Sequence, residues 1–128
     1  MKACYTLRVY TEFSAAHTLA GYDGACQRMH GHNWKVETQI TSDKLDDVGM
    51  AIDFHDMKSA ARQIGDELDH RYLNELDAFK DINPTAENIA VYFYKQLSER
   101  LNTDSAKVSS VTIWENDRAC VSYSESEN

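Results

Sequence analysis

Alternating apolar and polar positions predict two long strands in the first third of the chain. From Tyr5 to His17 every second residue belongs to a mostly apolar row that ends at His17. A second strand is predicted from about Gly31 to Thr41, and its inward row begins with two histidines: His30, His32, Trp34, Val36, Thr38 and Ile40. Because residues two apart in a strand point to the same side, the histidines extend rows that face the core.

Two helices are predicted from apolar residues at helical spacing. Asp53 is a suitable N-cap for the first helix, which ends near Asp69-His70, and the second helix begins near Thr85, directly after Pro84. Roughly 14 residues connect the two helices, and a connection of this length usually serves a site or folds over another segment. The apolar stripes are Phe54, Met57, Ala60, Ala61, Ile64 and Leu68, then Ala86, Ile89, Ala90, Phe93, Leu97 and Leu101.

Two further strands are predicted at the end of the chain, from Lys107 to Glu115 and from Arg118 to Ser124, joined by a tight turn at Asn116-Asp117. The element order indicates an α+β fold with a four-stranded antiparallel sheet and two helices on one face. With 128 residues the chain fits a single domain, residues 1–128. An open sheet leaves two edges, which often pair between subunits.

Composition narrows the function. Hydrophobic residues make up 42% and charged residues 27% of the chain, no apolar stretch is long enough for a membrane span, and the first residues lack a signal-peptide core. We therefore expect a cytoplasmic protein. The formal net charge of −8 and scattered basic residues argue against nucleic acid as a partner and leave a small molecule. The three cysteines argue against a disulfide framework, and Cys4 and Cys120 are predicted to be small buried hydrophobic residues.

The run Cys26-Gln-Arg-Met-His30-Gly-His32 carries the candidate chemistry. His30 and His32 would face one point, and His17 on the other strand can supply a third nitrogen. Three histidines with an open fourth position are typical of a catalytic zinc site. An alternative remains open, in which Cys26 is the fourth ligand of a closed structural site. His55 is interpreted as a surface residue.

These residues belong to a longer pattern that resembles the 6-pyruvoyltetrahydropterin synthase family, and most nearly its 6-carboxy-5,6,7,8-tetrahydropterin synthase branch of queuosine biosynthesis. The spacer of three residues between Cys26 and His30 is typical of that branch, whereas the animal pyruvoyl-forming enzymes usually have a longer one. The resemblance covers nearly the whole chain. It rests on residues 13–17, 26–33, 52–54, 68–70, 72–74, 83–85 and 87–88 and on Glu115.

The resemblance implies a tunnelling fold in which subunits join their sheets into a barrel, a homohexamer made of two trimers, and active sites at subunit interfaces. It also implies Zn²⁺ as the cofactor, held by His17, His30 and His32. Zinc would acidify the adjacent side-chain hydroxyls of the substrate and stabilise the charge that forms.

The remaining roles implied by the resemblance concern proton transfer and substrate binding. Cys26 would be the general base, as a thiolate stabilised by nearby positive charge, and Asp69 with His70 would form a second catalytic pair. Because neighbours on a helix do not face each other, either the helix ends here or another carboxylate, such as Glu115, orients His70.

Glu115 would bind the pterin ring through a bidentate pair of hydrogen bonds. It also follows Val111 and Ile113 in an apolar row, where an unpaired carboxylate would be costly. Thr85 would assist at the helix start, and Arg28 is a candidate for binding the triphosphate.

The implied reaction converts 7,8-dihydroneopterin triphosphate to 6-carboxytetrahydropterin, with release of acetaldehyde and triphosphate. Three alternatives remain at this point. The chain could form 6-pyruvoyltetrahydropterin by triphosphate elimination, it could be a structural zinc module that binds a partner, or it could be a thiol hydrolase that uses Cys26 with His70 and Asp69.

Overall fold

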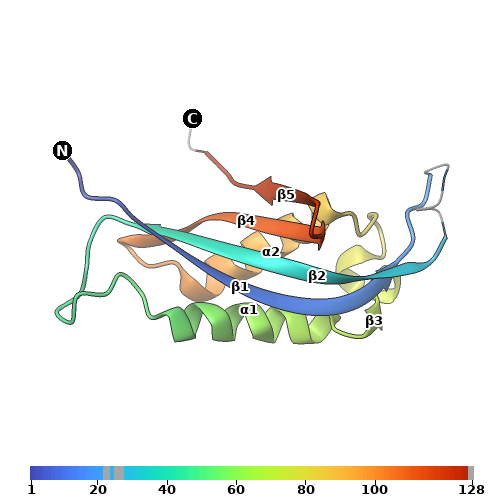
Figure 1. Ribbon diagram of the computed structural model, residues 1–128, viewed down its shortest axis with the longest axis horizontal. Coiled ribbons are helices and arrows are strands. Elements are labelled where there is room, and N and C mark those ends of the chain that lie inside the picture. The colour runs from blue at the N-terminus through green and yellow to red at the C-terminus, as the bar shows by residue number, and fades with distance from the viewer. Residues whose placement is uncertain (22–23, 25–27, 127–128) are drawn as a thin grey trace.

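A single mixed sheet carries two helices on one of its faces in the computed structural model, which describes residues 1–21, 24 and 28–126 (Figure 1). Within these residues the sheet has five strands in the order β3-β1-β2-β4-β5. The strands are β1 Tyr5–His17, β2 His30–Ser42, β3 Arg71–Tyr72, β4 Ala106–Asn116 and β5 Ala119–Tyr123, and the helices are α1 Phe54–Leu68 and α2 Ala86–Leu101.

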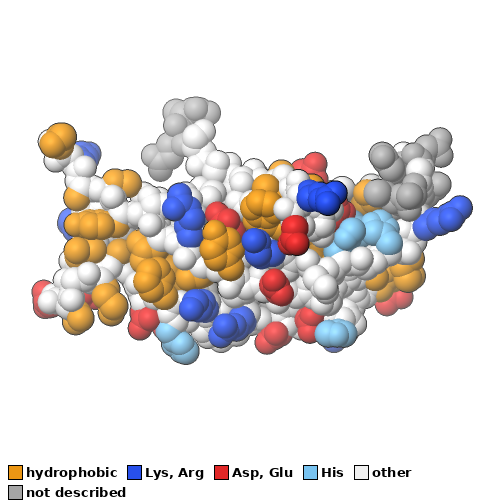
Figure 2. All heavy atoms as spheres, viewed as in Figure 1, with side chains coloured by type: hydrophobic (Ala, Val, Ile, Leu, Met, Phe, Trp, Pro, Cys, Tyr) orange, Lys and Arg blue, Asp and Glu red, His pale blue; other side chains and the backbone are white. Residues whose placement is uncertain are grey.

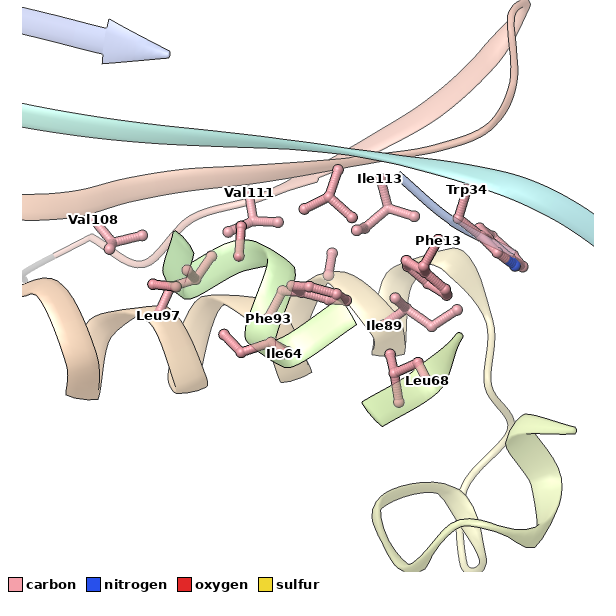
Figure 3. Close-up of a cluster of buried hydrophobic side chains, with 14 of the residues drawn as sticks. Phe13, Trp34, Ile64, Leu68, Ile89, Phe93, Leu97, Val108, Val111 and Ile113 are labelled. Carbon is pink, nitrogen blue, oxygen red and sulfur yellow. The ribbon is translucent and has the colours of Figure 1, made fainter. Parts of the chain in front are cut away.

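The core fills the space between the sheet and the two helices (Figure 3). Phe13 of β1 stacks on Trp34 of β2, at 6.2 Å between ring centroids, and on Phe93 of α2 at 5.7 Å. Most residues of the predicted stripes point into this layer, and Met57 and Ile64 are fully buried. Phe54 does not follow the prediction, because it is the first residue of α1 and its side chain is 53% exposed. The predicted cap is also present, because Asp53 accepts a hydrogen bond from the backbone N–H of His55. At the predicted start of the second helix, Thr85 caps α2 by accepting a hydrogen bond from the backbone N–H of Asn88.

The prediction of four antiparallel strands was wrong in one respect. A fifth strand, β3, pairs in parallel with the end of β1, where Ala15 lies beside Arg71 and Ala16 beside Tyr72. Two residues are too few for an alternating pattern to be visible in the sequence. The connector that contains β3 also forms two short 3₁₀ helices, Leu73–Glu75 and Asp77–Phe79, and it buries Leu73 and Phe79 against the core.

The last hairpin is displaced by one residue from its predicted position. Asn116 pairs with Ala119, so the turn residues are Asp117 and Arg118 instead of Asn116 and Asp117. The side-chain Oδ1 of Asn116 accepts a hydrogen bond from the N–H of Arg118 at 2.8 Å. Asn116 therefore stabilises the turn from its first flanking position, as asparagine side chains often do.

The prediction that Cys4 and Cys120 are buried was also wrong, because both are free and exposed. Cys4 precedes β1, and Cys120 lies on the edge strand β5, where its neighbour Val121 is the more buried residue. A strand at the edge of a sheet has one side open, so a hydrophobic residue type does not ensure burial there. Across the described residues, no helix has both the length and the apolar character needed to cross a membrane.

Candidate metal centre and catalytic pair

The register between β1 and β2 brings the three predicted histidines together. His17 pairs with His30, and Ala15 pairs with His32, in the antiparallel ladder of these strands. The ring centroid of His17 lies 4.4 Å from that of His30 and 5.4 Å from that of His32. The ring centroids of His30 and His32 are 4.8 Å apart. Figure 2 shows histidine side chains gathered near one end of the molecule. The spacing rule that predicted a shared point is thus confirmed.

Two of the imidazoles are oriented by backbone carbonyls. The Nδ1 of His17 lies 2.7 Å from the carbonyl oxygen of Pro84, and the Nδ1 of His30 lies 2.7 Å from that of Arg28. A carbonyl can only accept, so Nδ1 carries the proton in both rings and Nε2 presents a lone pair. These two Nε2 atoms are 2.8 Å apart. Two lone pairs at this distance require a shared cation between or beside them.

Glu115 completes the group from β4. Its Oε1 lies 3.1 Å from the Nε2 of His32 and 3.8 Å from the Nε2 of His17. The Nε2 of His32 is buried and has no hydrogen-bond partner among the described residues, even though the carboxylate is close. Within that same part of the chain, ligand atoms of His17, His30, His32 and Glu115 all lie within 4.8 Å of one another.

The electrostatics of the cluster favour a metal ion over a proton as the shared cation. Burial lowers the pKa of His17 and of His32 below the ordinary value of 6.5, and the charges of neighbouring histidines lower each of them further. The side chain of His17 is only 1% exposed. The rings of His17 and His32 are therefore neutral near pH 7, as metal ligation requires. A donor set of three nitrogens and a carboxylate, with carbonyls fixing two of the rings, fits a zinc-like ion.

Asp69 and His70 form the predicted pair because the helix ends just before them. The last residue of α1 is Leu68, Asp69 is extended, and His70 takes a left-handed backbone conformation with φ of 57°. The Oδ2 of Asp69 lies 2.8 Å from the Nδ1 of His70. Asp69, and not Glu115, therefore orients His70, since the carboxylate of Glu115 contacts the histidine cluster.

The backbone of Ser14 holds this pair against β1. The N–H of Ser14 donates to Oδ1 of Asp69 at 2.8 Å, and the N–H of His70 donates to the carbonyl of Ser14 at 2.5 Å. The hydrogen bond from Ser14, followed by that from His70, lowers the pKa of Asp69 below 3.8. Asp69 is therefore ionised at neutral pH, and it accepts the Nδ1 proton of His70. This leaves Nε2 of His70, on a side chain that is 82% exposed, free to exchange a proton with a ligand.

The pair and the histidine cluster lie on opposite faces of the sheet. Ser14 and Asn33 belong to the alternate rows of β1 and β2, whose side chains point to the face opposite the histidines. Their side chains are hydrogen-bonded to each other at 2.7 Å. His70 lines an open hollow with the residues of this second face, which include Ser14, Ala16, Gly31, Asn33 and Tyr72. Of the clustered ligands, His32 also borders this hollow, whereas His17, His30 and Glu115 do not.

Three contacts from the connector were missed by sequence reasoning. The carbonyl of Pro84 orients His17, as described above. Asn74 accepts from the N–H of Thr18 at 2.9 Å and donates to its carbonyl at 2.8 Å, and Asn83 makes the same pair of bonds to Ala20 at 2.9 and 2.8 Å. Both asparagines belong to the pattern that carries the family resemblance, and that pattern was the available signal. The connector therefore contacts the end of β1 and the residues that follow it.

The other candidate residues have separate outcomes. Cys26 lies outside the described residues. The hydroxyl of Thr85 is engaged as the N-cap of α2, where it accepts from the N–H of Asn88 at 3.1 Å. Arg28 is exposed and contributes its backbone carbonyl to His30. His55 is exposed, which confirms its interpretation as a surface residue.

The fold and the site together define an α+β domain with a cluster of potential metal ligands at one end of its sheet. The chain belongs to the 6-pyruvoyl tetrahydropterin synthase family, whose model matches residues 6–126.

Among its relatives is a 6-carboxy-5,6,7,8-tetrahydropterin synthase of Synechocystis, which is 37% identical over 98 residues and matched over 71% of this chain and 74% of its own. A protein of the same name from Haemophilus influenzae is 30% identical over 135 residues, covering 88% and 94%. The solved structure of Caenorhabditis elegans 6-pyruvoyl tetrahydropterin synthase superimposes with a TM-score of 0.86 at 28% identity, covering 98% of each chain.

Proposed function

We propose that the chain is a 6-carboxy-5,6,7,8-tetrahydropterin synthase, a carbon–carbon lyase. It converts 7,8-dihydroneopterin triphosphate and water to 6-carboxytetrahydropterin, acetaldehyde and triphosphate. The observation that carries this proposal is the cluster of three histidines and Glu115, in a chain that is similar over most of its length to relatives of that name. The short spacer between Cys26 and His30 supports the same branch of the family.

The proposed cofactor is Zn²⁺, bound by His17, His30 and His32. When bound, it would act as a Lewis acid that makes the side-chain hydroxyls of the substrate more acidic. The protein prepares this site in advance, because the carbonyls of Pro84 and Arg28 hold two rings with their Nε2 atoms facing inward. Such outer hydrogen bonds keep ligands in position and maintain the neutral form that binds a metal.

The proposed proton transfers use Cys26 on one side of the substrate and His70 on the other. Cys26 would take a proton as a thiolate. His70 would exchange a proton at Nε2, because its Nδ1 proton is held by Asp69. An ionised carboxylate at 2.8 Å also stabilises the imidazolium that forms when Nε2 accepts a proton.

The pterin ring is proposed to bind at Glu115. Beside this carboxylate lies a small hollow between the first turn of α2 and β5, lined by Ala86, Glu87, Glu115, Ala119, Cys120 and Val121. The ring presents an N–H and an amino group side by side, and a carboxylate can accept from both. Thr85 at the start of α2 would assist, and Arg28 would bind the triphosphate.

Active sites between subunits are part of the proposal, and the placement of these groups supports them. Strand alternation directs the histidine side chains of the cluster toward the helices, whereas His70 lines a hollow on the other face of the sheet, which His32 alone of the cluster also borders. For both to act on one substrate, His70 would come from a second copy of the chain. We propose the homohexamer of two trimers, with sheets joined into a barrel, as the assembly that provides this. Mixing inactive Cys26→Ala and His70→Ala proteins after mild dissociation should restore part of the activity, because some sites then combine two intact halves.

Product analysis tests the proposed reaction. The zinc-loaded protein is incubated with 7,8-dihydroneopterin triphosphate. Acetaldehyde is measured with a coupled alcohol dehydrogenase, and the pterin product is identified by mass spectrometry. We expect acetaldehyde and 6-carboxytetrahydropterin in equal amounts, and His55→Ala, which removes an exposed histidine, should behave as the wild type. Release of triphosphate with a 6-pyruvoyl product and no acetaldehyde would instead assign the sister reaction, which the superposition on the nematode enzyme supports.

Two alternatives of other classes make different predictions. A structural zinc module would lose its metal in Cys26→Ala, whereas the lyase keeps metal and loses turnover. A thiol hydrolase that uses Cys26 with His70 would remain active after chelation of the metal, whereas the lyase would be inactive.

A further inference from the structure

The imidazole of His17 is buried, and one hydrogen bond decides how its ring is turned. The side chain is 1% exposed and meets Trp34 edge to face, at 5.1 Å between ring centroids. An imidazole turned by half a rotation about its Cβ–Cγ bond fills nearly the same space, so packing against Trp34 does not select one orientation. The carbonyl of Pro84, 2.7 Å from Nδ1, does select one, because a carbonyl can only accept a hydrogen bond.

A tight turn gives the carbonyl of Pro84 its direction. The N–H of Thr85 donates to the carbonyl of Asn83 at 2.9 Å, and a hydrogen bond between residues two apart defines a γ-turn, here with Pro84 at its centre. The proline ring fixes φ at about −65°, which suits the inverse form of this turn, with φ of about −75°. Proline has no N–H of its own to donate. The position of its carbonyl therefore depends on what holds the residues on either side.

Asn88, in the first turn of α2, binds both neighbours of Pro84. Its side-chain Nδ2 donates to the carbonyl of Asn83 at 2.8 Å, so this oxygen accepts two hydrogen bonds. Its backbone N–H donates to the hydroxyl of Thr85 at 3.1 Å. The bond to Thr85 is a helix cap, which any residue with a backbone N–H could make at this position. The bond to Asn83 needs a side-chain donor of this length, so capping does not explain the amide of Asn88.

We propose that Asn88 is a positioning residue of the metal centre. Its amide fixes the γ-turn at Pro84, and the carbonyl of Pro84 in turn directs Nε2 of His17 into the cluster. The inference rests on the proposed function for the presence of a metal ion in the cluster, and it does not depend on the reaction. Loss of an outer hydrogen bond to a metal ligand typically costs about 10–100-fold in metal affinity. Because Asn88 acts one bond further out, we expect an effect of about tenfold.

The experiment compares Asn88→Ala with the wild type in the full-length protein, and it uses Co²⁺ in place of zinc. Cobalt affinity is measured by titration against a competing chelator, and we expect Asn88→Ala to bind cobalt about tenfold more weakly. The orientation of the ring is followed separately in the metal-free protein through the ring ¹⁵N chemical shifts of His17. These shifts should place the proton on Nδ1 in the wild type and show a mixture of tautomers in Asn88→Ala, because the carbonyl of Pro84 is no longer held in place.

Two variants separate positioning from stability. Asn88→Asp keeps the size of the side chain, and the helix dipole favours an acidic residue in the first turn of α2. It lacks the amide donor, so it should remain folded and bind cobalt at least as weakly as Asn88→Ala. Asn102→Ala is the matched control, because the Oδ1 of Asn102 accepts from the N–H of Val108 at 2.7 Å at the other end of the same helix. It should lower the urea midpoint of unfolding and leave cobalt affinity and the His17 shifts unchanged.

Three results would overturn the inference. Wild-type cobalt affinity and a single His17 tautomer in Asn88→Asp would remove the role of the amide and leave the proposed metal centre and reaction intact. An equal loss of cobalt affinity in Asn88→Ala and Asn102→Ala would reduce the effect to a general loss of stability. If the wild type itself bound no cobalt, the proposed metal centre would fail together with this inference.

Discussion

The histidine cluster and the Asp69–His70 pair lie near the same end of β1, yet they are built in different ways. The cluster is partly buried, and it comes from two long strands whose register aligns His17 with His30. The pair is exposed and comes from a chain reversal, where His70 has a positive φ and Asp69 is bound by the backbone of Ser14. The cluster thus depends on strand periodicity and the pair on a local turn, so each can be removed without the other.

The largest expected effect comes from removing a ligand of the cluster. His30→Ala should abolish activity and lower the metal affinity. The fall in affinity should be far greater than the roughly 10–100-fold that follows removal of an outer-shell hydrogen bond. Metal content after gel filtration and a competitive chelator titration measure this. If His30→Ala retained metal as tightly as the wild type, the cluster would not be the metal centre.

Removing the exposed imidazole should separate the two regions. His70→Ala should lower kcat by roughly 10²–10⁴-fold, the usual contribution of a general acid or base, while its metal content and unfolding midpoint stay unchanged. His55→Ala, an exposed histidine on α1, is the matched control and should retain full activity. A His70→Ala protein with normal kcat would show that the pair has no part in the reaction.

A smaller effect is expected where the connector supports the cluster. Asn83→Ala removes two hydrogen bonds to the backbone of Ala20 and should lower the free energy of unfolding by about 1–2 kcal/mol. Metal affinity should fall by about tenfold or less, since the neighbouring Pro84 still orients His17. Urea unfolding with and without metal measures the change in the free energy of unfolding and the change in metal affinity. Gln63→Ala, which loses only a bond to Ser59 within α1, should change stability by less than about 0.5 kcal/mol.

The smallest effects are expected from pH, where the two regions respond in separate ranges. Burial lowers the pKa of His17 and His32 below 6.5, so the unfolded chain binds these protons more readily, and the metal-free protein should lose stability as pH falls below 6.5. The pKa of Asp69 is lowered from 3.8, so its contribution is present above 3.8 and is lost as pH falls through the lower folded value.

Urea midpoints of the metal-free protein across this pH range measure both losses. Asp69→Asn should still lose stability below pH 6.5, as the wild type does, but it should lack the further loss that the wild type shows below pH 3.8. A wild-type midpoint that stayed constant between pH 7 and pH 5 would contradict the assignment of the first loss to the buried histidines.

Much of the fold and of the metal cluster could be predicted because they depend on periodicity. Period two in residues 5–17 and 31–41 places the histidines on the core-facing rows, and the helical stripes place both helices over that face. The predicted N-cap Asp53 and the predicted helix start near Thr85 are local as well, since each depends on the next two or three residues. The strand β3 left no such signal, because it has two residues and is defined by its partner on β1.

By itself, the sequence determined which residues could act together and which face each would take, because side-chain direction in a regular element follows from spacing alone. Only the tertiary structure decided that Asp69 orients His70, that Glu115 touches the histidines, and that Pro84 fixes the ring of His17. These contacts join residues through a positive φ, a strand pairing and a connector of irregular shape. Such geometry arises from packing against distant parts of the chain, so spacing along the sequence does not contain it.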